Sequence, residues 1–143
     1  MMRLRRLDLT RFGHFTDRSL DLGPVTPGGS DFHIIHGPNE SGKTTLMEAW
    51  LRLLYGFPLR EPYGFKHPLN TLQIGGQIEI DGTAIDLVRV KRTANSLLDR
   101  HGDPVPETIL NASLGGISQE DYRKLFCLDD ARSEERRVGK ECA

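Results

Sequence analysis

Eight residues in the first third of the chain constrain its fold more than any other feature. The stretch GPNESGKT, Gly37 to Thr44, fits the pattern G-x-x-x-x-G-K-[ST]. It follows the short apolar run DFHIIHG, which is typical of a buried strand, and it precedes an amphipathic segment. A strand, a glycine-rich turn and a helix in this order are the context in which the pattern forms a phosphate-binding loop, or P-loop. The sequence therefore predicts an α/β fold organised around this loop.

The chemistry of a nucleoside triphosphate explains each residue type in the pattern. Gly37 and Gly42 allow tight bends and a close approach of the backbone to phosphate. The N–H groups from Asn39 to Thr44 are expected to surround the β-phosphate, and Lys43 adds a positive charge for the β- and γ-oxygens. The Thr44 hydroxyl is the expected Mg²⁺ ligand, and the positive end of the following helix points at the same anion. The predicted nucleotide-binding residues are Gly37, Pro38, Asn39, Glu40, Ser41, Gly42, Lys43, Thr44 and Thr45, with Lys43 also the catalytic candidate.

Three segments read as β-hairpins. Apolar residues alternate through much of 3–22 around a loop near Gly13. A second pair of β-rich runs, within 71–92, is joined by Asp81-Gly82, a strong hairpin signal at short range. A third, smaller hairpin is predicted over 96–106.

Helical spacing predicts one long helix and two short ones. Apolar residues recur every three or four positions from Lys43 to about Tyr55, with Trp50 on the apolar side and Gly56 as the stop. Three prolines make 57–70 an irregular excursion. The short helices are expected over 106–116, ended by glycines, and over 118–128, begun by Ser118 and Asp121 in capping-box spacing.

Composition bounds the class of protein. The 143 residues and the 27% of charged residues are the length and composition expected of one ordinary globular domain. The formal net charge of −1 gives no global attraction for nucleic acid. Cys127 and Cys142 lack metal-ligand spacing and fit a reducing cytoplasm, and no apolar run approaches the ~20 residues of a membrane span.

The last residues do not continue any of these patterns. ARSEERRVGKECA, residues 131–143, is polar, has no apolar face and follows LFCLDD without a turn. It is similar to translated vector sequence, so the native part of the head domain is expected to be residues 1–130.

Three segments together carry a family resemblance: LRRLDLTRFGHFTDRSLDLG, FHIIHGPNESGKTTLMEAWLRLLYGF and LFCLD. They resemble the N-terminal ATPase segment of the YhaN family, bacterial relatives of SbcC-type and SMC-like ATPases. The resemblance covers about residues 1–129. Its most specific parts are the opening L-x-L-x-x-F-x-x-F-x-D, the Pro-Asn-Glu inside the P-loop and the closing LLYGF.

This resemblance implies the N-terminal half of an ABC-type ATPase head that is split by a long coiled coil. ATP and Mg²⁺ are then the expected cofactors. The expected partners are the C-terminal half of the same head, which carries the signature motif and Walker B, and a second head in a homodimer. In the related proteins, hydrolysis moves the coiled coils in DNA repair or chromosome maintenance, so DNA is a further candidate partner. By itself the present chain is expected to be inactive.

The sequence departs from the family pattern around the first loop and near its end. Relatives often place a nucleotide-contacting arginine directly after the phenylalanine of the first loop. Here Gly13 follows Phe12, and Arg11 precedes it. At the other end, Asp129 lies nearest the position of the Q-loop, which makes it a second candidate for the metal.

Three short stretches imitate other ATPase motifs. LFCLDD, Leu125 to Asp130, has the form of a Walker B strand, but helical spacing and the Ser118 cap favour the end of a helix. IEID, Ile78 to Asp81, ends in the aspartate of a hairpin turn. SLGGIS, Ser113 to Ser118, is similar to the signature LSGGQ, but Leu114 stands at the serine position and Ile117 replaces the glutamine. A glycine stop between helices explains it better.

Other functional classes remain open at this point. A complete small P-loop GTPase or kinase would use LFCLDD as Walker B, but no N-K-x-D guanine motif is present. A non-catalytic DNA-tethering module would use a basic stripe, for which solvated strand faces are the plainer interpretation. The residues of that stripe are Arg3, Arg5, Arg6, Lys91 and Arg92. An ABC transporter subunit is a third class, and the RFGHFTD opening argues against it.

Overall fold

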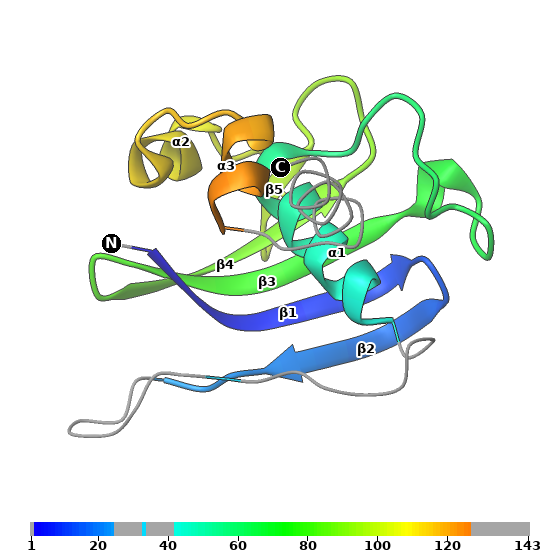
Figure 1. Ribbon diagram of the computed structural model, residues 1–143, viewed down its shortest axis with the longest axis horizontal. Coiled ribbons are helices and arrows are strands. Elements are labelled where there is room, and N and C mark those ends of the chain that lie inside the picture. The colour runs from blue at the N-terminus through cyan, green and yellow to red at the C-terminus, as the bar shows by residue number, and fades with distance from the viewer. Residues whose placement is uncertain (1, 25–32, 34–41, 127–143) are drawn as a thin grey trace, which may run out of the picture.

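A five-stranded antiparallel sheet forms the body of the molecule (Figure 1). The computed structural model describes residues 2–24, 33 and 42–126. Neighbouring strands follow the order β2-β1-β3-β4-β5, so β1 lies between its hairpin partner β2 and the later strand β3. The strands are β1 (Met2–Phe12), β2 (Phe15–Asp21), β3 (Gln73–Ile80), β4 (Thr83–Val90) and β5 (Leu97–Asp99).

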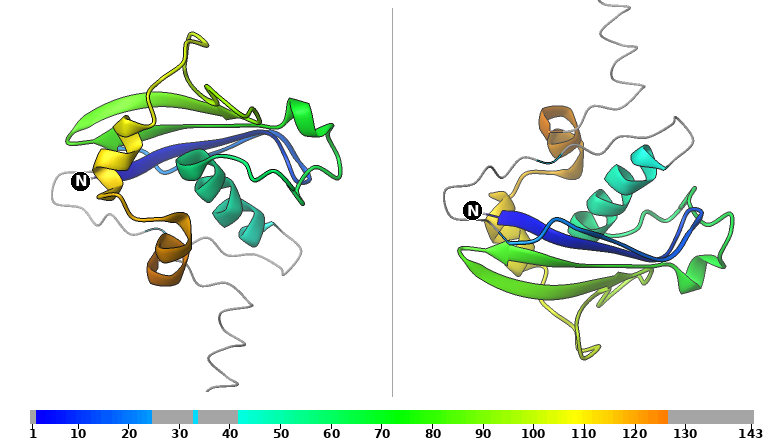
Figure 2. Two further views of the ribbon diagram at one scale, coloured as in Figure 1. Left: turned by 90° about the horizontal axis from the view of Figure 1, so that it is seen from above. Right: turned by 90° about the horizontal axis from the view of Figure 1, so that it is seen from below.

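The helices of the described chain lie on one face of this sheet (Figure 2). They are α1 (Lys43–Tyr55), α2 (Thr108–Leu114) and α3 (Gln119–Phe126), with a 3₁₀ turn η1 (Leu69–Thr71) before β3. The predicted bounds of α1 are confirmed at both ends, and Gly56 follows it with φ 93°. The described residues thus form a mixed α/β fold, as predicted.

All three predicted hairpin segments contain antiparallel pairing. The first turns at Gly13, with φ 58°. The second turns at Asp81 and Gly82, with φ 48° and 83°, as a type I′ turn requires. IEID therefore ends in a turn, as expected. The third pairs Leu98 with Pro104 across a short loop.

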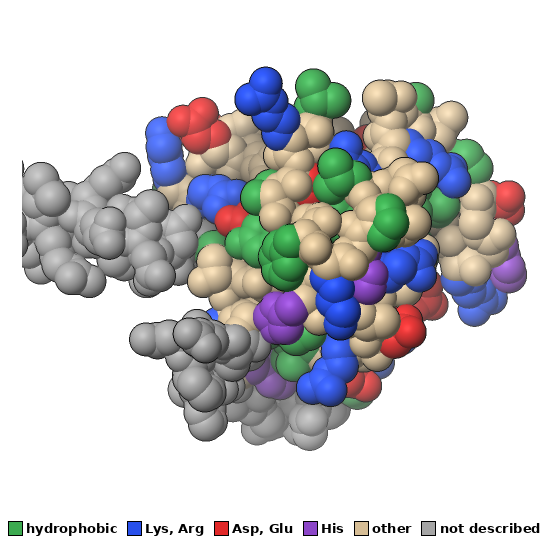
Figure 3. Space-filling model, turned by 90° about the vertical axis from the view of Figure 1, so that its right-hand side faces the viewer, with side chains coloured by type: hydrophobic (Ala, Val, Ile, Leu, Met, Phe, Trp, Pro, Cys, Tyr) green, Lys and Arg blue, Asp and Glu red, His purple; other side chains and the backbone are tan. Residues whose placement is uncertain are grey.

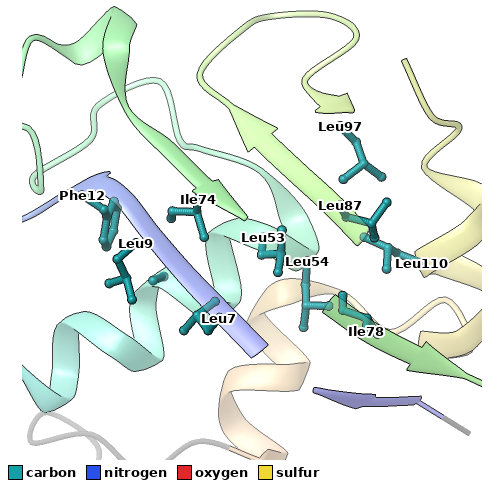
Figure 4. Close-up of a cluster of buried hydrophobic side chains, with 11 residues drawn as sticks. Leu7, Leu9, Phe12, Leu53, Leu54, Ile74, Ile78, Leu87, Leu97 and Leu110 are labelled. Atoms are coloured by element: carbon teal, nitrogen blue, oxygen red, sulfur yellow. The ribbon is translucent and has the colours of Figure 1, made fainter. Parts of the chain in front are cut away.

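A β-bulge aligns the core residues of β1. Leu7 and Leu9 alternate inward, and a register shift between Leu9 and Arg11 then brings Phe12 to the same face. All three side chains are at most 2% exposed. They pack with apolar residues of α1, β3, β4 and β5 (Figure 4). Trp50 packs at the margin of this core and is half-buried, so the expectation of a core tryptophan holds only in part.

A glycine in β3 allows α1 to lie close against the sheet. A Cβ built on Gly76 would lie 2.9 Å from Leu53 Cδ2 and 2.7 Å from the Arg6 carbonyl oxygen. No side chain fits between these two atoms. Gly76 thus sets the distance between α1 and the sheet, and with it the position of the start of α1.

The short helices α2 and α3 lie within the predicted ranges, and the predicted end of α3 at residue 128 lies outside the described residues. Gly115, in the left-handed conformation, ends α2, so SLGGIS is a helix stop. Ser118 Oγ accepts a 3.2 Å hydrogen bond from the Asp121 amide and caps α3. Leu125 and Phe126 belong to this helix, which supports the helical interpretation of the start of LFCLDD. The remainder of that stretch, the predicted strand through DFHIIHG apart from His33, and the tail lie outside the described residues.

Candidate phosphate-binding site

The start of α1 offers main-chain donors to a ligand. Gly42 precedes the helix in the left-handed conformation, φ 94° and ψ 22°, and no side chain caps the helix. The first helical hydrogen bond runs from the Leu46 amide to the Gly42 carbonyl oxygen at 3.0 Å. The amides of Lys43, Thr44 and Thr45 therefore have no acceptor within the helix. Such amides, at the positive end of the helix dipole, are suited to an anion.

The side chains of the first turn are compatible with the same ligand. No acidic residue lies in this turn. Lys43 is half-buried, Thr44 is exposed, and Thr45 is buried at 8% exposure. A cation and an exposed hydroxyl at the positive end of the helix dipole fit a phosphate group with its Mg²⁺, whereas an acidic first turn would repel it.

The β1–β2 turn packs directly against the start of α1. A Cβ on Gly42 would lie 2.7 Å from His14 Cε1 and 2.7 Å from Phe15 Cζ, and one on Gly13 would lie 2.9 Å from Thr45 Cγ2. The His14 and Phe15 rings lie 4.1 Å apart between centroids. The sequence shows no signal for this contact beyond the glycines, because it joins residues about thirty positions apart.

The excursion 57–70 supports this turn from the other side. The Gly13 amide donates to the Tyr63 carbonyl oxygen at 2.9 Å, and the Tyr63 ring stacks on Phe12 at 4.9 Å. His67 Nε2 lies 3.0 Å from Thr16 Oγ1 on β2. The irregular excursion expected from its prolines is thus confirmed, and it supports the hairpin that packs against Gly42.

The same excursion presents apolar side chains to solvent. Leu59 is 85% exposed and Phe65 is 69% exposed. Lys66 follows Phe65 and donates weakly to the His14 carbonyl oxygen, at 3.4 Å. Figure 3, which views this end of the molecule, shows hydrophobic side chains among basic and histidine side chains.

Arg11, the candidate for a nucleotide contact, is engaged within the sheet. Its Nε donates to the Thr71 carbonyl oxygen at 2.6 Å, and its Nη2 donates to Gln73 Oε1 at 3.2 Å. These bonds direct the guanidinium to η1 and the start of β3. The described geometry provides no contact between Arg11 and α1.

A buried charge network crosses the middle of α1, and the sequence analysis missed it. Arg52 donates to Glu48 on the same helix at 2.7 Å and to Glu61 in the excursion at 2.7 Å. Arg123 of α3 donates to both oxygens of Glu48, at 2.5 and 3.1 Å. Glu48, Arg52 and Glu61 are each at most 8% exposed. Spacing four residues apart on one helix was the only available signal for the Glu48–Arg52 pair.

The network sets the protonation of its members. Burial raises the pKa of Glu48, but the hydrogen bonds and charges of Arg123 and Arg52 outweigh burial and hold the pKa below its ordinary value. Burial lowers the pKa of Arg52, and the carboxylates of Glu61 and Glu48 raise it above its ordinary value. Glu48 and Arg52 are therefore both ionised at neutral pH.

An apolar hollow of about 290 Å³ lies between α1 and the β1–β2 hairpin. Its walls are leucines of the two strands and the exposed edge of α1, and Lys43 stands at one end. The lining residues are Leu4, Leu7, Leu20, Leu22, Lys43, Leu46, Met47 and Trp50. The hollow thus begins beside the predicted phosphate site.

The three arginines that β1 contributes to the basic stripe have partners within the described chain. Arg6 forms ion pairs with Asp8 at 3.0 Å and with Asp86 at 3.2 Å. Arg5 lies 3.9 Å from Glu79, and Arg3 donates to the Gly23 carbonyl oxygen. This arrangement is what solvated strand faces require, and DNA binding by these residues stays a prediction.

The structure places four of the predicted site residues together, Gly42 to Thr45, at the start of α1. Gly37, Pro38, Asn39, Glu40 and Ser41 lie outside the described residues, as does Asp129. Within 2–24, 33 and 42–126, no group of three His, Cys, Asp or Glu side chains is arranged to hold a metal ion. In the same ranges, no helix is long and apolar enough to cross a membrane.

Comparison with known proteins identifies the family of the chain. The sequence profile of a family described as AAA domain matches residues 2–137. The chain belongs to this AAA domain family. It is also 25% identical over 133 residues to "Uncharacterized protein YhaN" of Bacillus subtilis (strain 168). The match covers 90% of the present chain and 13% of that relative, so the chain spans a small part of the relative's length.

The resemblance to YhaN-type ATPases that the sequence suggested is therefore confirmed. For this AAA domain, membership agrees with the mixed α/β fold and with a nucleotide as the ligand class. The boundary expected at residue 130 stays a prediction.

Proposed function

We propose that this AAA domain is the N-terminal part of an ABC-type P-loop ATPase head and that it binds Mg²⁺-ATP at the start of α1. One observation carries the proposal: the Gly42-Lys43-Thr44 end of G-x-x-x-x-G-K-[ST] opens a helix that has no side-chain cap and no acidic residue in its first turn. The Lys43 ammonium would bind the β- and γ-phosphate oxygens, and the Thr44 hydroxyl would face the Mg²⁺. Residues 37–41 complete the proposed loop by sequence.

In the full-length protein, we expect ATP hydrolysis to drive conformational change. Bound Mg²⁺-ATP supplies a phosphoryl group whose transfer to water needs a positioned water and stabilisation of charge. In the proposed site, the residues at the start of α1 would supply the phosphate contacts. The proposed partners are therefore the C-terminal half of the same head and a second head, and DNA repair or chromosome maintenance is the proposed setting. Similarity to YhaN supports this view.

The test is the affinity of the 143-residue chain for Mg²⁺-ATP, measured by calorimetry. Replacing Lys43 with Ala removes charged hydrogen bonds to phosphate, each worth about 1.5–3 kcal/mol, so affinity should fall roughly 10- to 100-fold. Lys124→Ala is the matched control because Lys124 is exposed on α3, in a surface pair with Glu120. Retained affinity in Lys43→Ala would exclude the loop as the site.

A further inference from the structure

In the described part of the chain, α3 contacts α1 through polar side chains. The Trp50 indole N–H donates to the Tyr122 hydroxyl at 3.0 Å. Arg123 binds both carboxylate oxygens of Glu48. Leu125, by contrast, is 67% exposed. The Tyr122 ring also meets Tyr55 of α1 edge-on, with 6.0 Å between ring centroids. Paired charges, one hydrogen bond and this ring contact thus attach α3 to the helix that follows the proposed P-loop.

The charges of this attachment balance only when α3 is docked. Arg123, Glu48, Arg52 and Glu61 alternate in sign along the network. Without Arg123, Arg52 alone would face two carboxylates that are each 8% exposed. A buried carboxylate that loses its counter-charge is strongly unfavourable. Docking of α3 therefore stabilises the ionised form of α1 that the structure shows.

The attachment point lies close to the phosphate end of α1. Glu48 follows Thr44 by four residues, so the two lie on the same side of the helix, about 6 Å apart along its axis. A helix is stiff over one turn. A displacement of Glu48 will therefore also displace the amides of the first turn and the Thr44 hydroxyl.

We propose that Arg123 and Glu48 form a latch that couples the docking of α3 to nucleotide binding at the start of α1. The inference rests on the proposed function, because it assigns regulation to the same site. Both are positioning residues that act through α1. In a protein as long as the relative YhaN, the polypeptide that follows α3 is joined directly to this latch. Movement of that polypeptide would change the affinity of the site for the phosphates. By reciprocity, bound nucleotide would favour the docked position of α3 by the same factor.

The chain contains its own reporter of docking. Trp50 is the only tryptophan, and its indole N–H is bonded to α3. In the 143-residue chain, Arg123→Met should shift Trp50 emission to longer wavelength and should lower Mg²⁺-ATP affinity about tenfold, within the usual range of coupling. Arg123→Lys keeps the charge and should recover most of that affinity. Lys124→Met, the neighbouring exposed position on α3, should change neither reading.

Each result decides between the two proposals. If Arg123→Met shifts the emission but binds Mg²⁺-ATP as tightly as wild type, the latch is wrong and nucleotide binding stands. Equal losses in Arg123→Met and Arg123→Lys would also overturn it, since the charge would then be irrelevant. Wild-type chain that binds no Mg²⁺-ATP overturns the proposed function, and the coupling with it. Far-UV circular dichroism confirms that each variant keeps its helices, and a variant that loses them is replaced by Glu48→Gln, for which the same tenfold loss is expected.

Discussion

The guanidinium of Arg89 on β4 binds the last turn of α1 through the Leu53 carbonyl oxygen, at 2.9 Å from Nη2. The same nitrogen reaches the Leu54 carbonyl oxygen at 3.2 Å, and Arg89 is 1% exposed. The last carbonyls of a helix lack partners within it and carry the negative end of its dipole. A strand residue thus caps the helix whose other end is the proposed phosphate site.

Replacing Arg89 with Met should lower the free energy of unfolding by about 2–4 kcal/mol, because buried carbonyls lose a charged donor. Glu107, the carboxylate partner of Arg89, has a side chain 48% exposed. Glu107→Gln keeps one acceptor oxygen but removes the charge opposite a buried guanidinium, so it should cost about 1–2 kcal/mol, less than Arg89→Met. Urea unfolding followed by circular dichroism measures both. Similar losses in the two variants would show that the ion pair, and not the helix cap, is what matters.

Gly76→Ala tests the close contact between α1 and β3. The new methyl group would meet the Arg6 carbonyl oxygen and Leu53, so we expect a loss of about 1–3 kcal/mol from overpacking. Gly75 is the matched control in the same strand, since a Cβ there would lie 3.3 Å from its nearest neighbour, the Leu87 carbonyl oxygen. In thermal unfolding, the midpoint temperature of Gly76→Ala should be well below that of Gly75→Ala. The reverse order would contradict the described contact.

Local sequence signals predicted much of this fold, but they do not specify contacts between residues that are far apart in the sequence. The bounds of α1 follow from the glycines at 42 and 56 and from apolar spacing between them, and the Asp81-Gly82 turn needs only its own dihedral angles. The pairing of β1 with β3 joins residues about seventy positions apart. Nothing in either strand alone specifies that partner.

The buried charges were missed for a related reason. In LVRV, residues 87–90, the two valines share one face of the strand, and Arg89 interrupts the other face. Alternation therefore suggests that the valine face is the buried one. The structure instead buries Leu87 and Arg89, because Arg89 finds carbonyl acceptors on α1. Glu61 stands between prolines in an irregular segment, yet it is buried against Arg52. Burial of a charge depends on a partner from elsewhere in the chain, which periodicity does not report.

Acid should weaken the protein through Glu48. Its pKa in the folded state lies below the ordinary value of 4.5, so its contribution to stability is complete above that pH and is lost as pH falls through the folded pKa. At neutral pH, Glu48→Gln should cost about 3–5 kcal/mol, the usual effect of breaking a buried pair. The difference in the free energy of unfolding between wild type and Glu48→Gln, measured in urea, should become smaller below pH 4.5. Glu120→Gln, on the exposed side of α3, should show a constant and small gap.

Gly42→Ala should weaken phosphate binding more than it weakens the fold. The residue has φ 94°, which disfavours any side chain by about 1 kcal/mol, and its Cβ would push into the His14 and Phe15 rings. Displacement of that turn or of the helix start should lower Mg²⁺-ATP affinity at least about tenfold, which corresponds to the loss of one hydrogen bond to a charged group. Gly82→Ala is the matched control: φ is 83°, nothing lies within 4 Å of the new methyl group, and the turn is remote from α1 in sequence. Gly82→Ala should lose a similar free energy of unfolding from its positive φ, and calorimetry should show unchanged affinity for Mg²⁺-ATP. If both variants bind Mg²⁺-ATP equally well, the packing of the β1–β2 turn on Gly42 does not shape the site.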